Sequence, residues 1–409
     1  MVLRLYDPEK DKEAVHRIWF ETGWLEKDKE QIMDLFIQGT RPMVGEMDGE
    51  AECLVLCTPG TMRYLEQDLA LTAVTGVTTS RVARKQGLAR RLTALSIAQA
   101  VAEGAEVAGL GMFDQGFYNQ LGFGNGGYEH WVNFNPARLN VKVRARVPRR
   151  ITAKDWEMAH ASRLSRMRRN GFCNLTPPQI TQAEMQWTTN GFGLGYCDGP
   201  NGELTHHFWC RAKNVQDGPY SVTWMTYQNY DQFLELMALI KNLGDQVVLV
   251  EMCEPPGIQL QDLIEEPLRQ RHMTRQSKFE IGTRAVAYSQ VRICDVQKGL
   301  SKTHLRCEPV RLNLELSDPI ARFLPDDAPW RGVAGKYQVT LGPRSQAEPG
   351  ADPALPTLVA SVGAFTRLWL GIRSATSLAV TDELHGPPAL LETLDWALLL
   401  PQPRFDWDF

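Results

Sequence analysis

The chain has no run of roughly 18 apolar residues, the length that a membrane-spanning helix needs. Its opening residues, Met1-Val2-Leu3-Arg4, do not resemble a signal peptide. Its eight cysteines include no Cys-x-x-Cys pair, which argues against a zinc site and against a disulfide framework. We therefore expect a cytoplasmic protein with reduced, mostly buried thiols and no membrane partner.

An excess of charge of one sign is also missing, because the formal net charge is −4 over 409 residues. A general nucleic-acid binder would carry a basic excess, so we expect no nucleic-acid partner, although residues 142–150 are locally basic. His206 and His207 form the only adjacent histidine pair, and neighbouring side chains on a strand point to opposite faces. We therefore expect no metal site.

The chain does contain a predicted strand, a basic turn and a predicted helix in direct succession. Residues 71–79 are rich in β-branched side chains, which are typical of a strand. From residue 88 to 101, apolar residues recur at three- and four-residue spacing, which predicts a helix that buries one face. This helix should begin near Gly87 and end near Gly104.

The start of this predicted helix favours a polyanion. A helix start exposes backbone N–H groups and carries partial positive charge, and the small residues Gly87 and Ala89 let a diphosphate approach the main chain. Four cations occupy the same turn, namely Arg84, Lys85, Arg90 and Arg91. The turn is not a Walker loop, because it lacks a Gly-Lys-Ser/Thr ending. The alternative is an ordinary turn with a solvated basic face.

A second segment follows at a fitting distance. Residues 107–113 are predicted to form a buried strand, and residues 117–124 read Phe-Tyr-Asn-Gln-Leu-Gly-Phe-Gly. Together the two segments resemble the GCN5-related N-acetyltransferase (GNAT) superfamily. The resemblance implies that residues 84–89 hold the pyrophosphate of acetyl-coenzyme A and that Tyr118 lies beside the cofactor sulfur. The alternative for Tyr118 is a core tyrosine with one satisfied hydroxyl.

The middle of the chain repeats the order of this first domain without the basic turn. We predict a helix at 153–169, a loop at 177–178, strands at 206–211 and 220–227, a helix at 230–243 and an apolar run at 246–252. Residues 191–195 resemble a glycine-rich loop but no helix follows them, so we interpret them as a turn or loose loop. A duplicated acetyltransferase fold that has lost its cofactor site is the simplest explanation.

The last part of the chain, from about residue 289, is predicted to mix strands and helices. The predicted strands are residues 311–316, 335–341 and 357–362, the predicted helices are 361–372 and 387–400, and residues 343–356 are predicted to be a flexible insert.

Over its whole length the chain resembles the Eis-like (enhanced intracellular survival) acetyltransferases. The resemblance rests on Gly76-Val77-Thr78-Thr79 before Arg84 to Leu92, on Gly116-Phe117-Tyr118 with Gly122-Phe123-Gly124, on Val291 to Val296, on Leu368 to Gly371 and on a terminal phenylalanine. It implies a mixed α/β (α+β) chain with an active GNAT domain at 1–147, a degenerate GNAT domain at 148–287 and a sterol-carrier-protein-like domain at 288–409. It also implies a homo-oligomer, a hexamer.

The chain departs from this family in two places. Phe113-Asp114 stands where a Ser-Glu pair is usual, and Gln86 interrupts a turn that is usually all arginine. We expect cofactor binding to survive both changes. The predicted cofactor-binding residues are Val77, Thr78, Thr79, Arg84, Lys85, Gln86, Gly87, Leu88, Ala89, Arg90, Phe113 and Asp114.

Acyl transfer to an amine needs three things: a free amine that attacks the thioester, stabilisation of the oxyanion, and a proton for the leaving thiolate. Strand backbone at residues 77–79 can pair with the pantetheine arm and offer an N–H to the carbonyl oxygen. In the family, the tyrosine that matches Tyr118 is the acid for the thiolate. The family's base is the α-carboxylate of the last residue, here Phe409.

The composition of the tail gives this last role independent support. Phe405, Trp407 and Phe409 alternate with two aspartates, so an extended tail can dock three aromatic rings on one side and hold the terminus in place. A terminal carboxyl has a low intrinsic pKa and stays ionised, which suits it to attract a cationic amine and relay its proton. The alternative is a buried hydrophobic clamp.

Three functions stay open at this point. The first is an acetyl-coenzyme A dependent N-acetyltransferase for amines of cationic small molecules or lysyl side chains. The second is a non-catalytic lipid-binding, ligand-binding or interaction protein that acts through the sterol-carrier-like domain. The third is an acyltransferase for a longer chain or an oxygen nucleophile, in which Phe113 reshapes the acyl pocket.

Overall fold

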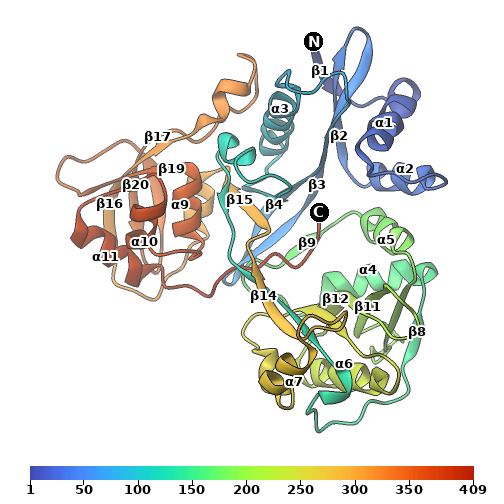
Figure 1. The fold of residues 1–409 in the computed structure, drawn as a ribbon. Coiled ribbons are helices and arrows are strands. Elements are labelled where there is room, and N and C mark those ends of the chain that lie inside the picture. The colour runs from blue at the N-terminus through green and yellow to red at the C-terminus, as the bar shows by residue number, and fades with distance from the viewer. The chain divides into compact units, whose positions relative to one another are not determined.

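The computed structural model describes all residues from Met1 to Phe409 and divides them into two compact units (Figure 1). The first unit contains residues 1–127, 169–176 and 288–409, and the second contains residues 128–168 and 177–287. Helices and strands are mixed along the whole chain, so the mixed α/β class predicted from the sequence is confirmed. None of the helices is long and apolar enough to span a bilayer.

The first unit is built on a sheet in the order β1-β2-β3-β4-β5-β15-β6, with β9 added at the end of β3. Its strands are β1 (Val2–Leu5), β2 (Arg41–Met47), β3 (Glu50–Tyr64), β4 (Gln67–Thr79), β5 (Val107–Gly111), β6 (Gly124–Asn125), β9 (Cys173–Leu175) and β15 (Ser289–Ile293). Figure 1 shows α1 (Pro8–Thr22) and α2 (Glu30–Gln38) on one face of this sheet and α3 (Leu88–Ala102) on the other.

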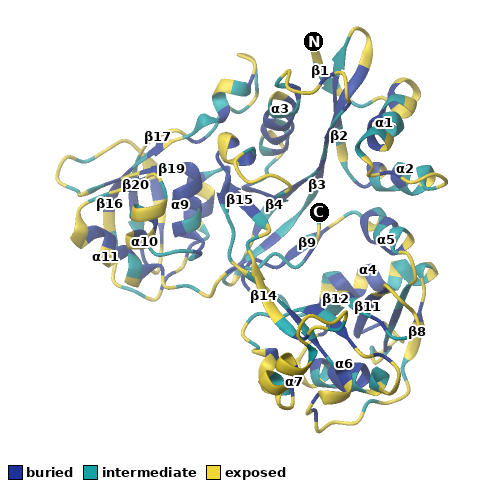
Figure 2. Cartoon of the chain, in the orientation of Figure 1, coloured by how far each residue is buried: buried dark blue, intermediate teal, exposed yellow.

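Helix α3 is buried over much more than the single face that its sequence pattern predicts. Its inner face packs on β3 and β4, and Ile320 and Leu324 from the far end of the chain pack into the same core. Small side chains such as Ala94 and Ser96, both buried, let these layers approach closely. Buried residues therefore dominate both α3 and β3 (Figure 2).

The first unit also contains a five-stranded sheet in the order β18-β17-β16-β19-β20. Its elements are β16 (Val310–Ser317), β17 (Gly335–Leu341), β18 (Gln346–Pro349), β19 (Thr357–Ser361), β20 (Leu384–His385), α8 (Val296–Ser301), α9 (Val362–Trp369), α10 (Ala375–Thr381) and α11 (Pro388–Ala397). The prediction of a flexible insert at 343–356 is wrong in part, because β18 pairs with β17 from Thr340 to Tyr337. The proline and glycine residues there mark the hairpin turn and the strand ends.

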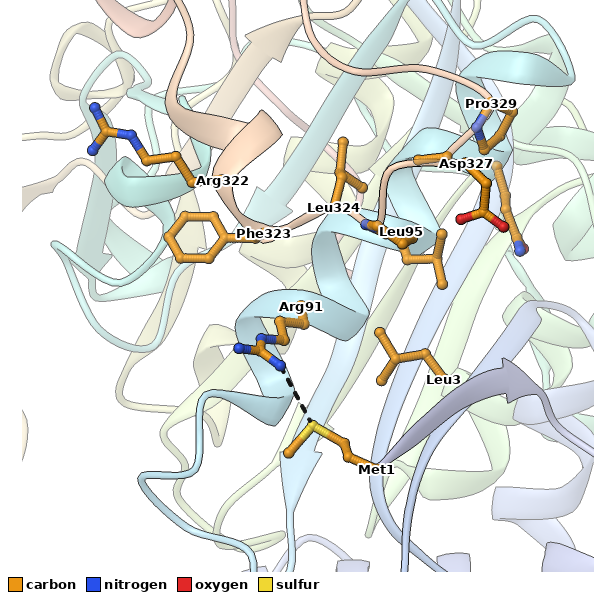
Figure 3. Close-up of a pocket in the computed structure, with 12 residues that line it drawn as sticks. Met1, Leu3, Arg91, Leu95, Arg322, Phe323, Leu324, Asp327 and Pro329 are labelled. Atoms are coloured by element: carbon orange, nitrogen blue, oxygen red, sulfur yellow. Dashed lines mark hydrogen bonds between the residues drawn. The ribbon is translucent and has the colours of Figure 1, made fainter.

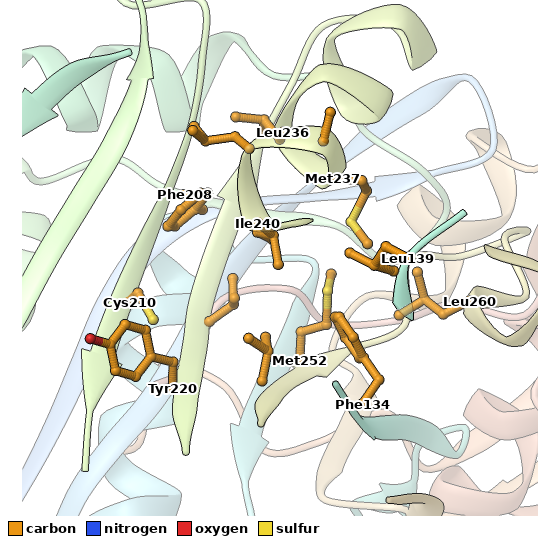
Figure 4. Packing of buried hydrophobic residues seen from close by; sticks show 14 of the residues in the cluster. Phe134, Leu139, Phe208, Cys210, Tyr220, Leu236, Met237, Ile240, Met252 and Leu260 are labelled. Atoms are coloured by element: carbon orange, nitrogen blue, oxygen red, sulfur yellow. The ribbon is translucent and has the colours of Figure 1, made fainter. Parts of the chain in front are cut away.

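The second unit has a seven-stranded sheet in the order β14-β7-β13-β12-β11-β10-β8. Its elements are β7 (Glu129–Phe134), β8 (Arg149–Ile151), β10 (Gly191–Tyr196), β11 (His206–Ala212), β12 (Tyr220–Thr226), β13 (Val250–Cys253), β14 (Gly282–Val286), α4 (Trp156–Ser165), α5 (Pro178–Trp187), α6 (Tyr230–Lys241) and α7 (Pro267–Thr274). Figure 4 shows Phe134, Phe208, Ile240 and Met252 gathered in its core between the sheet and α6.

Two local predictions for this unit are wrong. Residues 191–195 form strand β10 instead of a loose loop, because their glycines make room for bulky neighbours: a Cβ on Gly191 would lie 2.7 Å from the Trp209 ring. Pro178 starts α5 instead of lying in a loop, which fits the tolerance of proline at the first helical position.

The two sheets follow the same plan. β4 runs parallel to β5 and β12 runs parallel to β13, each over three residue pairs, and a helix connects the two strands in both cases. Next to β5 lies β15, which follows the second unit in the chain, and next to β13 lies β7, which precedes most of it. These GNAT-like sheets agree with tandem acetyltransferase folds, the prediction made from the order of elements.

Two strands are exchanged relative to the chain order on either side of the second unit. β7 lies in the sheet of the second unit, and β15, expected to open the third domain, completes the sheet of the first. The first and third segments of the chain form one compact unit. The three-domain division and the sterol-carrier-like character of residues 288–409 stay predictions.

Candidate active site

An opening forms in the first sheet where β4 and β5 part. The two strands pair only from Leu71–Ala73 to Val107–Gly109, while β4 continues to Thr79. A bulge at this point shifts the register against β3, and Gly76 adopts the left-handed φ of 60°. A Cβ on Gly76 would lie 2.7 Å from Leu56, so only glycine fits there. On the side that faces β5, β4 therefore has no strand partner beyond residue 73, while its other side stays paired with β3.

The predicted pantetheine-binding residues 77–79 lie on this unpaired edge. Thr78 is buried, and its hydroxyl accepts a hydrogen bond of 3.1 Å from the indole N–H of Trp19 on α1. That bond leaves the main chain of β4 as the part available to a ligand. Trp19 packs edge-to-face against Trp24 with ring centroids 5.8 Å apart, and Trp24 is 44% exposed. An aromatic surface thus lies beside the opening, on the face opposite α3.

The turn between β4 and α3 has the geometry of an anion site. Lys85 and Gly87 both adopt left-handed φ values, 63° and 74°, and no side chain caps the start of α3. A Cβ on Gly87 would meet nothing within 4 Å, so the backbone there is open to a ligand. The first turn contains no acidic residue. Its N–H groups and helix dipole are therefore free to bind a phosphate.

The cations of this turn fall into two groups. Arg84, Lys85 and Gln86 are exposed, and neither Arg84 nor Lys85 has a carboxylate partner. Arg90 reaches instead to the side-chain oxygen of Gln120, and its guanidinium lies 5.5 Å from the centroid of the Phe323 ring. Of the remaining predicted residues, Leu88 is buried and anchors the helix, and Ala89 is half-buried.

Arg91 lines a neighbouring cavity of about 690 Å³ (Figure 3). Its guanidinium nitrogen lies 3.9 Å from the sulfur of Met1. Leu3, Leu95 and Phe323 contribute apolar walls to this cavity. The contact that the structure gives the Arg91 guanidinium is therefore with Met1, although the sequence groups this residue with the other cations.

Tyr118 is the first residue of a short 3-10 turn, η1 (Tyr118–Leu121). Its ring packs edge-to-face against Phe117 and Phe123, with centroids 4.9 and 6.1 Å away, and the residue is 8% exposed. None of the hydrogen bonds found within the chain involves its hydroxyl. Burial, aided by the nearby Tyr288 and Asp114, raises the pKa of Tyr118 to about 12. The phenol therefore keeps its proton at neutral pH.

Phe113 and Asp114 lie in the loop between β5 and this turn. Phe113 is 91% exposed, and Asp114 is exposed as well. They occupy the same loop as Tyr118, but neither is packed into the core. Their part in cofactor or acyl binding stays a prediction.

The C-terminal tail is held in place, as its aromatic residues suggest. Trp407 is buried, the Arg404 N–H donates to the Asn170 carbonyl at 3.0 Å, and an Asp406 oxygen accepts from the Cys173 N–H at 2.9 Å. Phe405 packs against Gly109, since a Cβ on that glycine would lie 2.9 Å from the ring. The tail thus crosses β5 at the residue where its pairing with β4 stops.

Phe409 is the last residue of this anchored segment. Its ring lies 5.9 Å from that of Phe405, and the residue is half-buried. The last residue is therefore packed onto the ring that covers Gly109, and the two predicted catalytic residues, Tyr118 and Phe409, belong to the same unit.

Tyr288 is a residue of this region that the sequence does not reveal. Its ring approaches the end of β5 so closely that a Cβ on Gly111 would lie 2.6 Å from it. It is 44% exposed and helps to raise the pKa of Tyr118. No local motif marks Tyr288, because only the insertion of β15 beside β5 brings it here.

The second unit contains one group of three potential metal ligands, Asp198, His206 and Glu235, within 4.8 Å of one another. The Arg146 guanidinium bonds to both carboxylates, with nitrogen–oxygen distances of 2.7 Å to each. That cation already pairs with both acids, and its hydrogen bonds are the main reason that the pKa of Glu235 falls to about 2. The absence of a metal site stays a prediction.

The adjacent histidines point to opposite faces of β11, as predicted. His206 stacks on Tyr196, while the ring of His207 shares hydrogen bonds with Thr226 and Trp224. Burial lowers the pKa of His207 to about 3, so this histidine is a neutral core residue.

Comparison with known proteins agrees with this geometry. Residues 8–126 match the family described as "Acetyltransferase (GNAT) domain". No curated protein sequence is significantly similar to the chain. Among solved structures, a probable N-acyltransferase from Enterococcus faecalis V583 has a TM-score of 0.79 and 16% identity and covers 100% of this chain and 99% of its own.

Two further structures match over the full length. Eis1 from Mycobacterium abscessus has a TM-score of 0.78 and 15% identity, with 100% of both chains covered. A GCN5-related N-acetyltransferase from Kribbella flavida has a TM-score of 0.73 and 17% identity, covering 100% of this chain and 98% of its own. Residues 8–126 therefore carry a GNAT acetyltransferase domain, and the whole length of the chain has the fold seen in Eis1.

Proposed function

We propose that the chain transfers the acetyl group of acetyl-coenzyme A to an amino group of a cationic small molecule or of a lysyl side chain. The observation that carries the proposal is the open, cationic start of α3 beside the unpaired edge of β4. A thioester whose diphosphate binds at Gly87 can extend along that edge toward the hydroxyl of Tyr118.

Each predicted cofactor residue has a part in this arrangement. The main chain at Val77, Thr78 and Thr79 pairs with the pantetheine arm and offers an N–H to the thioester oxygen. Arg84, Lys85 and the amides of the first turn of α3 bind the diphosphate, and Gln86, Leu88, Ala89 and Arg90 shape the turn around it. Phe113 and Asp114 border the acyl end. Because the open backbone, the unpaired cations and the strand edge lie in one stretch of chain, these residues fit the cosubstrate that GNAT domains use.

The reaction then needs one proton transfer to sulfur. The amine nitrogen attacks the thioester carbon, and the strand N–H stabilises the negative oxygen that forms. Collapse of this intermediate breaks the carbon–sulfur bond, and the thiolate takes the proton of the Tyr118 hydroxyl. Because burial raises the pKa of Tyr118 to about 12, the phenol is protonated at neutral pH and a proton is present when the thiolate leaves.

We assign the role of base to the carboxylate of Phe409. The tail that carries it is anchored by Trp407 and by the packing of Phe405 against Gly109. A carboxylate held there attracts an ammonium group and accepts its proton, directly or through water. The partly exposed Trp24, which packs against Trp19, offers a further contact for a cation, since aromatic faces attract positive charge.

Three further features rest on the resemblance alone. We infer a cytoplasmic location, assembly into a homo-oligomer of six chains, and a sterol-carrier-like fold for residues 288–409. Sedimentation of the purified protein tests the assembly: a species of six chains is expected, and a monomer would overturn it.

The proposed function is tested by thiol release from acetyl-coenzyme A against a panel of amines. Polyamines, aminoglycosides and lysyl peptides should raise the rate well above the hydrolysis observed without amine, and neutral alcohols should not. Comparable stimulation by alcohols, or release that no amine changes, would contradict it. Replacing acetyl with longer acyl groups tests whether Phe113 alters the acyl pocket.

A further inference from the structure

The turn that carries Tyr118 has little structure of its own to fix the phenol. η1 is only four residues long, and the hydroxyl of Tyr118 has no partner in the chain. A proton donor must be held within a fraction of an ångström of its acceptor's path to be efficient. Besides the packing of its ring against Phe117 and Phe123, the position of Tyr118 therefore depends on the groups that hold this turn.

One such group is Asn119, the residue after Tyr118. Its side-chain oxygen accepts a hydrogen bond of 3.0 Å from the Gly116 N–H, and its amide nitrogen donates to the Phe123 carbonyl at 3.1 Å. One side chain thus closes the loop on both sides of the tyrosine.

Gln290 on β15 makes a hydrogen bond to the side chain of Asn119. It is fully buried, and its amide nitrogen donates to the Asn119 side-chain oxygen at 3.2 Å and to that of Asn125 at 2.6 Å. Two hydrogen bonds from one buried donor fix the orientation of both asparagines. The strand that carries Gln290 is also the partner of β5, so the amide is placed by a regular sheet.

Arg292 holds the other end of the same turn. It lies two residues along β15 on the same face, is fully buried, and donates to the Leu121 carbonyl at the end of η1. Its second nitrogen pairs with Asp318 at 2.6 Å. A Cβ on Gly122 would lie 2.9 Å from this guanidinium, so the glycine of the Gly-Phe motif makes room for it.

Asp318 connects this contact to the last part of the chain. Its carboxylate also accepts from the Ile320 N–H at 3.1 Å and from the Val333 N–H at 2.9 Å. The carboxylate that pairs with Arg292 is therefore itself held by the backbone, and the turn is tied to residues that follow the second unit in the chain.

We propose that Gln290 and Arg292 are positioning residues, which use the Asn119 side chain and the Leu121 carbonyl to place the Tyr118 hydroxyl for proton donation. The proposal rests on the proposed function, specifically on Tyr118 as the acid. It assigns a catalytic contribution to a strand outside the part of the chain that matches the GNAT domain.

The direct test is a double-mutant cycle between Gln290→Met and Tyr118→Phe. Gln290→Met keeps the volume and removes both hydrogen bonds, and it should lower kcat about tenfold while the KM for acetyl-coenzyme A stays within about twofold. In the Tyr118→Phe background it should have no further effect on kcat. Multiplying losses in the double variant, or a change in KM alone, would overturn the proposal.

Gln270→Met is the matched control, because Gln270 is a buried glutamine of the second unit that donates to the Glu265 carbonyl. It should leave kcat unchanged. Arg292 is less suitable for substitution, because removing it would leave the buried Asp318 carboxylate without its ion-pair partner and so destabilise the fold. Thermal unfolding of each variant establishes that the fold is intact.

A second readout does not depend on turnover. With 3-fluorotyrosine placed at position 118, Gln290→Met should shift and broaden the fluorine resonance, and Gln270→Met should not. Identical spectra for wild type and Gln290→Met would overturn the positioning role. If wild type shows no acetyl transfer, the proposed function fails, while these spectra still decide whether Gln290 fixes the ring.

Discussion

Two helices begin at equivalent places in the two sheets, and they differ in what their first turns leave open. α3 follows β4 and α6 follows β12, each before a strand parallel to the previous one. In α6 the Asn229 side chain accepts from the Gln232 N–H at 3.0 Å, and Asp231 lies in the first turn. In α3 the cap is Gly87, which has no side chain, and the first turn has no acid.

The difference shows how one fold gains or loses an anion site. A side-chain cap satisfies the N–H groups that a phosphate would bind, and an acid repels the phosphate. α6 is thus complete by itself, whereas α3 has unsatisfied donors beside Arg84 and Lys85. This physical distinction supports an active first repeat and a second repeat that has lost the cofactor site.

The largest effect should come from Tyr118→Phe. Loss of the acid should lower kcat about a hundredfold or more and leave coenzyme A affinity unchanged. Tyr196→Phe is the matched change in the second unit, where the hydroxyl donates to the Arg146 carbonyl, and it should leave kcat as it is. Because the pKa of Tyr118 is raised to about 12, the wild-type rate should show no loss from phenol ionisation near pH 10. Steady-state kinetics over pH would contradict the assignment if both tyrosine variants behaved alike.

Placing a side chain over the first turn of α3 should abolish much of its affinity. Gly87→Asn puts an amide group where the diphosphate approaches the backbone and should raise the Kd for coenzyme A about tenfold, and Gly87→Asp adds a negative charge and should raise it about a hundredfold. Asparagine and aspartate tolerate the left-handed φ found there, so the fold should persist. Asn229→Asp in α6 serves as the control and should change nothing. If calorimetry gave the wild type and the Gly87 variants equal affinities for coenzyme A, the proposed difference between the two helix starts would be contradicted.

Extending the tail should have a smaller but clear effect. Residues appended after Phe409 move the carboxylate away from the anchored end, so turnover should fall about tenfold while coenzyme A still binds and the melting temperature is kept. A cleavable extension supplies its own control, since proteolytic removal should restore the rate. Full activity of the uncleaved form would refute the role of Phe409 as base.

The smallest effect concerns the second unit and pH. The folded-state pKa of Glu235 is lowered to about 2, first by its hydrogen bonds with Arg146, so its contribution to stability is present above its ordinary pKa and is lost as pH falls toward 2. Glu235→Gln should therefore flatten the decline in stability between about pH 4.5 and 2. Acid unfolding curves measure this, and coenzyme A affinity at neutral pH should not change. If stability fell with pH in the Glu235→Gln variant as it does in the wild type, this prediction would be contradicted.

Local patterns predicted much of the fold from sequence. Helix α3 was expected between Gly87 and Gly104 and runs from Leu88 to Ala102, and β17 has the predicted bounds 335–341. Such patterns reflect spacings of two to four residues, which side chains on one strand or helix impose. They carry no information on which distant strand pairs with which, so the exchange of β7 and β15 between the two sheets was missed.

The candidate site was predictable to the same extent. The basic turn at 84–91 and Tyr118 lie within contiguous motifs, and both belong to the first unit. Tyr288, Gln290 and Arg292 reach the site only because β15 inserts beside β5, after an entire second unit. The glycines at 191–195 were interpreted as a loop for a related reason. They leave space for residues of the neighbouring strand, which the local sequence does not reveal.

The most direct measurement compares the affinities of coenzyme A and pantetheine by calorimetry at low and high salt. If the cationic start of α3 grips a diphosphate, coenzyme A should bind with one site per chain and weaken as salt rises, while pantetheine, which lacks the diphosphate, should bind far more weakly. Equal binding of the two compounds, or no binding of coenzyme A, would contradict the account.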